Sequence, residues 1–207
     1  MNNEDLVELL KLKDHLKSKK LEKVILETPR EYFVPEKMKN FAYQDIPLPI
    51  GYGQTISQPS TVIVMTEALD VKKNHKILEI GAGSGWQAAI LSKLCKKVYT
   101  VDIIPELVEI AKINLKKVGI KNVVIIKGDG SLGLKKYAPY DRIIVTCACP
   151  NVPKPLLDQL KMNGKMIIPV GNYYMQEMFI IKRGKKIERK SLGVFAFVPL
   201  RGKYGFK

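Results

Sequence analysis

The sequence predicts an α/β fold, with a mostly parallel sheet, antiparallel strands at its C-terminal end and an N-terminal helical cap. Between residues 76 and 160, short apolar runs typical of buried strands alternate with stretches of helical periodicity. This order is typical of a parallel sheet that helices cover on both faces. After residue 165 the strand patterns follow one another without helices, so we expect these last strands to pair antiparallel.

The N-terminal residues read as helix up to Pro29, and the segment from Tyr32 to Ser60 reads as loop. Met1 to Leu12 form an amphipathic pattern, the apolar spacing continues through Ile25, and Pro29 ends it. We therefore expect His15 to lie on the terminal helix, as a structural or solvated residue. From Tyr32 to Ser60 prolines and glycines are frequent, which predicts an ordered loop without sheet or helix. A loop of this length in a compact protein is usually functional.

The remaining elements follow from periodicity. Helices are expected over residues 59–69, 87–94, 106–118 and 154–160. Strands are expected over residues 76–80, 98–101, 123–126, 142–146, 165–170, 178–182, 186–189 and 194–198. At 207 residues the chain is expected to form one domain, in which residues 1–58 make the cap and a loop, 59–170 the α/β core and 171–207 the C-terminal strands.

Composition indicates a cytoplasmic protein. Hydrophobic residues make up 46% of the chain, but every apolar run is short, so no transmembrane helix is expected. The N-terminus has acidic residues and no signal-peptide pattern. The three cysteines (Cys95, Cys147 and Cys149) show no metal-type spacing, and we expect Cys147 and Cys149 to be small buried side chains on one face of a strand.

The net charge of +15 raises the possibility of nucleic-acid binding, because basic surfaces attract phosphate backbones. The excess is nearly all lysine and is scattered along the chain. The one dense stretch runs from Lys182 to Lys190 around Gly184 and is typical of a solvated hairpin. Nucleic acid and membrane are therefore not expected as partners.

A glycine-rich turn follows the first core strand. Residues 76–86 read KILEIGAGSGW, a buried strand that runs into Gly81, Gly83 and Gly85 and then a helix. Such a turn lets the backbone approach a ligand at the carboxyl end of a strand. A dinucleotide-binding turn has its third glycine at the position that Trp86 occupies here. The spacing instead resembles the loop that binds S-adenosylmethionine.

Acidic residues lie at three strand ends nearby. Asp102 ends the next strand, where a carboxylate can accept hydrogen bonds from both ribose hydroxyls, although it could instead cap the following helix. Glu79 could orient the glycine loop or the cofactor's amino group, or simply end a strand. Gly128, Asp129 and Gly130 would place a further carboxylate beside the adenine, but alone they are only a turn signal.

Several segments resemble the protein-L-isoaspartate O-methyltransferase family. They are residues 29–35 (PREYFVP), 48–59 (LPIGYGQTISQP), 128–130, 139–146, 168–171 and 197–202 (FVPLRG). The string from Gly53 to Ser57 is highly specific. The chain departs from the family's usual residues at Gln58, Asp102, Cys147, Asn163 and Cys149, none of which removes a required donor or acceptor.

The resemblance implies a Rossmann-like class I fold, S-adenosylmethionine as cofactor with S-adenosylhomocysteine as product, and no metal. It implies methyl transfer to the free α-carboxylate of L-isoaspartyl residues in damaged proteins and peptides. The methyl ester then cyclises, and repair follows. The family's active serine matches Ser57, and Thr55, Ile56 and Ser57 would bind the substrate. A carboxylate needs orientation rather than a general base. Ser57 could equally cap the helix that follows. We expect a monomer.

Two other functions remain open from the sequence. An RNA or DNA methyltransferase would use the same cofactor residues and benefit from the basic charge. Residues 146–150 (TCACP), however, lack the Asn or Asp followed by two prolines and an aromatic that base methylation often uses. A non-catalytic binding module would predict decay of the glycine loop, yet Gly81, Gly83, Gly85 and Asp102 are all present.

Overall fold

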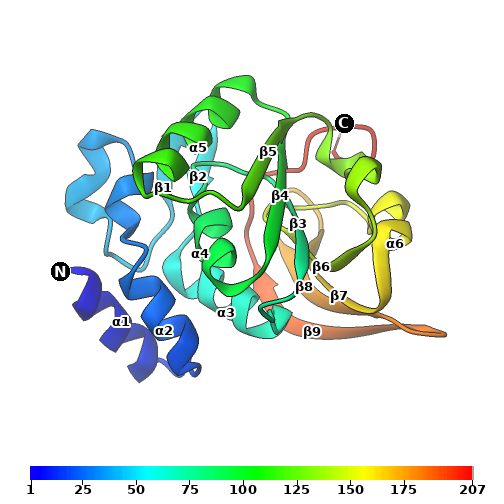
Figure 1. Cartoon of the computed structure of the whole chain (residues 1–207), viewed down its shortest axis with the longest axis horizontal. Helices are drawn as coiled ribbons and strands as arrows, with labels where there is room; N and C mark the ends of the chain where they lie inside the picture. The colour runs from blue at the N-terminus through cyan, green and yellow to red at the C-terminus, as the bar shows by residue number, and fades with distance from the viewer. Residues whose placement is uncertain (207) are drawn as a thin grey trace.

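The computed structural model describes residues 1–206 and contains a seven-stranded sheet in the order β5-β4-β3-β6-β7-β8-β9 (Figure 1). Strands β3 to β7 pair in parallel, and β8 and β9 extend the sheet antiparallel. The predicted fold class is confirmed. The strands are β3 (Lys76–Ile80), β4 (Lys97–Asp102), β5 (Val123–Lys127), β6 (Tyr140–Val145), β7 (Leu160–Gly171), β8 (Gln176–Arg183) and β9 (Ile187–Phe195).

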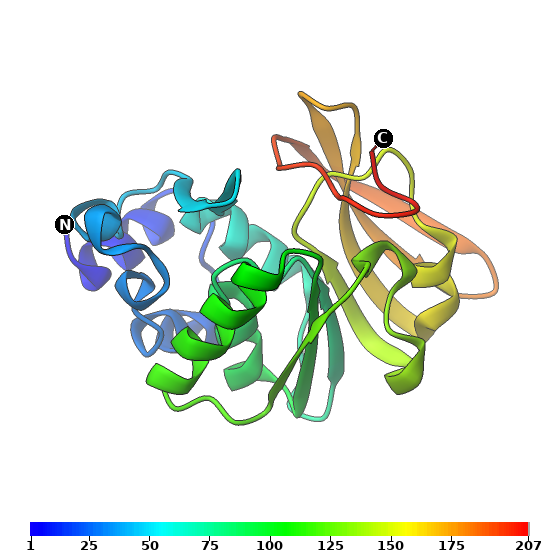
Figure 2. The same ribbon diagram turned by 90° about the horizontal axis from the view of Figure 1, so that it is seen from above.

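Helices cover both faces of the sheet, as Figures 1 and 2 show. The α-helices of the described chain are α1 (Asn3–Leu12) and α2 (Lys19–Leu26), which form the cap, and α3 (Pro59–Leu69), α4 (Trp86–Leu94), α5 (Pro105–Lys117) and α6 (Lys154–Gln159), which pack on the sheet. Along β3, Ile77 packs with α3, α4 and α5 in one apolar cluster, whereas Leu78 and Ile80 pack with α6 in the other. This alternation is the two-residue period of a strand. No helix in the described part of the chain is long and apolar enough to cross a membrane.

Two helices, rather than one, form the N-terminal cap, and His15 lies in the turn between them. The expectation that His15 lies on a helix was therefore wrong. Asn2 caps α1 in a capping box with Asp5. Buried Asn3 donates from Nδ2 to the carbonyls of Ile25 and Leu26, at 3.1 Å each, and so joins α1 to the end of α2.

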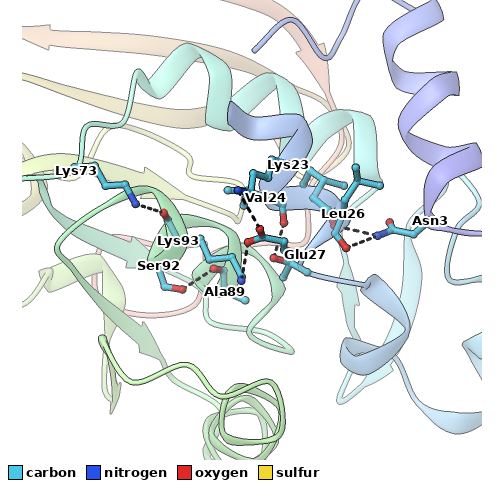
Figure 3. A network of polar contacts seen from close by, with 11 residues as sticks. Asn3, Lys23, Val24, Leu26, Glu27, Lys73, Ala89, Ser92 and Lys93 are labelled. Carbon is cyan, nitrogen blue, oxygen red and sulfur yellow. Dashed lines mark hydrogen bonds and ion pairs between the residues drawn. The ribbon is translucent and has the colours of Figure 1, made fainter. Parts of the chain in front are cut away.

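The end of α2 also contacts the core through charged side chains (Figure 3). Glu27 forms an ion pair of 3.1 Å with Lys93 of α4. Lys73 donates to the Lys93 carbonyl at 3.1 Å. These bonds are exposed and contribute little energy. Of the two, the Glu27–Lys93 pair links the cap to α4, the helix that follows the glycine turn.

The segment from Tyr32 to Ser60 is not only loop, so that expectation was wrong. It contains the 3₁₀-helices η1 (Arg30–Phe33, which begins two residues earlier) and η2 (Glu36–Phe41), and a hairpin of β1 (Leu48–Gly51) and β2 (Gln54–Ile56). Gly51, Tyr52 and Gly53 all have positive φ and close the hairpin tightly. Prolines are tolerated here because this two-stranded sheet consists of edge strands.

Three other expectations needed correction. Two strands were expected over residues 186–189 and 194–198, but one strand, β9, runs without a break from Ile187 to Phe195. A register shift opposite Glu177 and Phe179 lets pairing with β8 continue past Ser191 and Gly193, where strand propensity is low. Strand β7 begins at Leu160, directly after α6. Cys147 and Cys149 lie beyond the end of β6, although both are buried as expected.

A buried guanidinium holds the irregular segment that precedes α3. Arg30 is fully buried, and the Cζ atom of its guanidinium lies 5.4 Å from the centroid of the Trp86 ring. Its terminal nitrogens donate to five carbonyls, those of Ala42, Gln44, Ile46, Ile56 and Ser57, at 2.9–3.4 Å. Burial lowers the pKa of Arg30 to about 10, which leaves it charged at neutral pH. We call residues 42–57 the strap, because Arg30 bonds to both of its ends.

We predict that Arg30→Met lowers the free energy of unfolding by about 3 kcal/mol or more, because buried strap carbonyls lose their donors. Arg30→Lys should lose less, since an ammonium keeps the charge but offers only three donors. Urea denaturation measures both. Arg189→Met, on exposed β9, is the matched control and should change stability by less than about 0.5 kcal/mol. Equal midpoints for Arg30→Met and the control would contradict this role.

Candidate active site

The glycine turn after β3 is shaped by a threonine on the neighbouring strand's extension. Gly81 has φ +93°, and a Cβ there would lie 2.5 Å from Oγ1 of Thr146. That hydroxyl lies 2.8 Å from the Gly81 carbonyl and 3.0 Å from the Ile80 carbonyl, so it donates into the turn. Only glycine fits position 81 without displacing this hydroxyl.

Asp102, at the end of β4, fixes the same turn from the other side. Its Oδ2 accepts from the Gly83 amide and its Oδ1 from the Ile104 amide, both at 3.0 Å. The side chain is 8% exposed. A carboxylate has about four acceptor positions, so two remain for donors from a ligand. Asp102 can therefore position the turn and accept from two hydroxyls.

These residues surround a first cavity at the carboxyl edge of the sheet. Of the predicted cofactor residues, Gly81, Gly83, Asp102 and Gly130 line it. The other lining residues are Gln54, Thr55, Ile80, Val101, Ile103, Ile104, Leu107, Thr146, Cys147, Val198, Pro199, Leu200 and Arg201. Its walls are mostly apolar, with a few polar groups, as is usual for a cofactor site.

Four predicted cofactor residues do not line this cavity. Gly85 precedes α4, and a Cβ there would contact Ala111 of α5 at 3.4 Å. Gly128 has no close neighbour that demands a glycine. The fourth is Glu79, which is treated below. Asp129 accepts from the Ser131 amide and hydroxyl and from the Lys203 amide at 2.6–2.9 Å. Asp129 therefore holds the C-terminal segment that supplies Leu200 and Arg201 to the cavity.

Glu79 is fully buried within β3, and not at the strand's end. It shares a face of the sheet with Ile77, beneath the layer of α3 and α4. No hydrogen bond of normal geometry reaches either of its oxygens in residues 1–206. Burial raises the pKa of Glu79 to about 8; the nearby Thr100 hydroxyl opposes this shift and the charge of Asp102 adds to it. The side chain is therefore mostly protonated at neutral pH.

The strap residues named from the sequence lie between the first cavity and two others. Thr55 and Thr146 line all three cavities, and Ser57 lines the second and third. Ile56 is buried and lines the third. The Ser57 carbonyl accepts from Arg30 at 3.1 Å, which fixes the backbone beneath its hydroxyl. Ligands in the first and second cavities would thus meet at Thr55 and Thr146.

The second cavity, here called the groove, has a volume of about 420 Å³. It lies between α3, the strap, the α1–α2 turn and the chain after β9. Its lining residues are His15, Pro47, Thr55, Ser57, Gln58, Ser60, Thr61, Val64, Thr146, Val194, Phe195, Ala196, Phe197 and Val198. The volume is in the range of sites that bind ligands of drug size.

Sequence reasoning missed three residues of the site. Thr146 was read only as a strand end, His15 as part of a helix, and Gln87 as an ordinary helical residue. Gln87 lines the third cavity and donates to Thr66 at 3.1 Å, but its buried Oε1 has no partner in the described chain. An unsatisfied buried acceptor is costly unless a ligand supplies a donor.

The residues present fit the cofactor that the resemblance implies. The cofactor's ribose needs acceptors, which Asp102 has free; its adenine needs apolar walls, which the first cavity has; and its ammonium needs an acceptor, which Gln87 offers. No group of three or more His, Cys, Asp or Glu in residues 1–206 is arranged to hold a metal.

Comparison with known proteins identifies close relatives over the whole chain. Residues 1–205 match the family Protein-L-isoaspartate(D-aspartate) O-methyltransferase (PCMT). The chain is 49% identical to protein-L-isoaspartate O-methyltransferase 1 of Archaeoglobus fulgidus, over 95% of this chain and 93% of that protein. It is 50% identical to the Dictyoglomus thermophilum enzyme, over 98% and 92%.

Solved structures of proteins with the same description have a similar fold. A protein-L-isoaspartate O-methyltransferase superimposes with a TM-score of 0.89 at 32% identity, over 98% of this chain and 67% of that one. A Plasmodium falciparum protein described as a β-aspartate methyltransferase (PCMT), solved in complex with S-adenosyl-L-homocysteine, gives 0.88 at 25% identity, over 97% and 99%.

We predict that Glu79→Gln gains stability relative to the unsubstituted protein as pH rises. Between pH 4.5 and about 8 the unfolded carboxyl releases its proton while the folded one keeps it, so the unsubstituted protein loses stability across this window. The loss is at most about 1.4 kcal/mol per pH unit and is absent below pH 4.5. Denaturation midpoints without ligand, at pH 4.5, 6 and 8, measure it. Exposed Glu188→Gln is the control. A difference that is constant across the three pH values would contradict the buried, protonated state.

Proposed function

The chain belongs to the protein-L-isoaspartate(D-aspartate) O-methyltransferase family, and we propose that its first cavity holds the cofactor and its groove the damaged polypeptide. It is an S-adenosylmethionine-dependent carboxyl O-methyltransferase whose substrates are proteins with L-isoaspartyl residues. The observation that carries the proposal is the junction of the two cavities at Thr55 and Thr146.

Some of the predicted cofactor residues contact the cofactor directly, and others hold the backbone that forms its cavity. Asp102, Gly81, Gly83 and Gly130 line the cavity and contact the cofactor, with Asp102 accepting from the ribose hydroxyls. The other residues act at one remove. Gly85 and Gly128 shape turns, Asp129 fixes the C-terminal segment, and Glu79 supports β3 from within the core. Gln87 is an additional candidate for the cofactor's ammonium.

The substrate-binding residues of the enzyme orient the isoaspartyl carboxylate, which is already a nucleophile. When bound, S-adenosylmethionine would supply a methyl group bonded to a positively charged sulfur. A carboxylate oxygen can bond to that methyl carbon without loss of a proton, while the carbon–sulfur bond breaks and the neutral thioether S-adenosylhomocysteine leaves. The hydroxyls of Ser57 and Thr55 donate to that carboxylate and orient it, and Ile56 packs beneath them. No general base is required, since the α-carboxyl of an isoaspartyl residue is ionised at neutral pH. Support comes from Arg30, which fixes the strap at Ser57.

We also propose a monomer in the cytoplasm, organised as one domain in which cap and strap, α/β core and C-terminal strands meet at the junction. Size-exclusion chromatography with light scattering tests the oligomeric state, and a dimer mass would overturn it.

We predict base-labile methyl incorporation into a peptide with an isoaspartyl residue, and none into the same peptide with normal aspartate. Labelled S-adenosylmethionine and paired synthetic peptides measure it. Methylation of neither peptide by protein that demonstrably binds the cofactor would reject the assignment and favour nucleic-acid substrates.

We predict opposite effects at the two cavities. Ser57→Ala should lower kcat/KM for the isoaspartyl peptide roughly 10- to 100-fold, the loss of one hydrogen bond to a charge, and leave cofactor affinity nearly unchanged. Asp102→Asn should weaken cofactor binding by a similar factor, because one acceptor becomes a donor. Calorimetry with S-adenosylhomocysteine and steady-state kinetics separate the two. If both variants lost both properties equally, Ser57 would have a structural role instead.

A further inference from the structure

The groove is larger than one isoaspartyl side arm requires. Its volume of about 420 Å³ could hold more than ten water molecules at about 30 Å³ each. Thr55 and Thr146 are shared with the cofactor cavity and mark the end where methyl transfer occurs. His15 lines the groove but neither of the other two cavities. It therefore lies beside a part of the groove that residues flanking the isoaspartyl position would occupy.

His15 is chemically distinct from everything else in the groove. The remaining lining residues are apolar or carry only neutral hydroxyl and amide groups, so among residues 1–206 His15 is the one ionisable side chain there. No hydrogen bond or ion pair reaches its imidazole from the described chain, and the side chain is partly exposed. An imidazole can donate a hydrogen bond, and it carries a positive charge when protonated.

The turn that carries His15 is fixed to the wall of the groove. Asp14 has φ +57°, and the His15 amide donates to the Leu10 carbonyl at 3.0 Å. The Glu67 carboxylate of α3 accepts from the amides of Lys17 and Ser18 at 3.2 and 2.8 Å. The turn therefore keeps a defined position against α3. His15 is part of a formed wall and not of a free loop.

Acidic groups around the turn are already engaged. Asp14 pairs with Lys17 at 2.7 Å, and Asp45 of the strap pairs with Lys13 at 2.9 Å while it accepts from the Ser60 amide at 2.8 Å. Glu67 is bound by the two amides of the turn. His15 is thus not committed to an internal carboxylate, and the protein's net charge of +15 favours an external one.

We propose that His15 forms a subsite for an acidic side chain of the substrate polypeptide, at a position flanking the isoaspartyl residue. The proposal rests on the proposed function, since it takes the isoaspartyl carboxylate to lie at Ser57. The imidazole donates to the flanking Glu or Asp carboxylate inside a groove that is otherwise neutral. His15 is then a specificity-determining residue, which acts on substrate binding and not on methyl transfer.

The test uses isoaspartyl peptides with a single Glu or Gln at each position from three residues before to three residues after the isoaspartyl residue. For the unsubstituted enzyme, at least one position should show a kcat/KM about three- to tenfold higher for Glu than for Gln, through KM. His15→Gln should abolish this preference, because the KM of each Glu peptide should rise to that of its Gln partner while the ratio of the two kcat values stays the same. His15→Lys, which restores a cation, should retain it.

Lys19→Gln is the matched control, because it removes a positive charge at the start of α2, close to the same turn, from an exposed side chain that lies outside the groove and forms no ion pair within residues 1–206. It should leave the Glu preference intact, whereas a preference due only to overall charge would fall in both variants. Equal Glu-to-Gln ratios in the unsubstituted enzyme and His15→Gln at every position would overturn the subsite. Failure of every isoaspartyl peptide to be methylated would instead reject the proposed function, so the two outcomes are distinct.

Discussion

The strap that carries Thr55 and Ser57 depends on one buried cation. Within residues 1–206 no carboxylate forms an ion pair with Arg30, although the charge of Asp45 acts on it, and the dipoles of five carbonyls supply most of the compensation. In return, a segment with little regular structure has its carbonyls satisfied in the interior. Trp86 lies against the same guanidinium and begins the helix after the glycine turn. One side chain thus positions the strap relative to the helix that follows the glycine turn.

The carboxyl edge of the parallel sheet brings the remaining parts together. Strands β3, β4 and β6 end side by side, so the turn at Gly81, the carboxylate of Asp102 and the hydroxyl of Thr146 converge although they are far apart in sequence. The C-terminal segment closes the cavity from above, fixed by Asp129. The chemistry of the site therefore comes from loops, and their precision comes from the sheet.

Local patterns were sufficient where local physics decides the structure. The bounds of α3 and β3 were predicted to the residue, and Gly81 and Gly83, which were singled out by their spacing, line the first cavity. Prediction failed where contacts between residues distant in sequence decide the structure. Strand β9 continues through Gly193 because β8 pairs with it. The segment 32–60 folds around Arg30. His15 reaches the groove only because a turn that sequence periodicity did not reveal docks on α3. Asp129 accepts hydrogen bonds from Ser131 and from the Lys203 amide, which the sequence did not indicate, and its place beside the adenine stays a prediction.

The neutral character of the junction between the two cavities restricts which nucleophiles can react. Thr55, Thr146 and Ser57 offer no strong base to remove a proton. Lysine amines are protonated and serine hydroxyls are un-ionised at neutral pH, so neither can accept a methyl group there. Acid–base chemistry thus disfavours lysine and serine side chains as methyl acceptors at the junction. The side-chain carboxylates of ordinary aspartate and glutamate are also ionised at neutral pH, so only the shape of the groove and strap can exclude them.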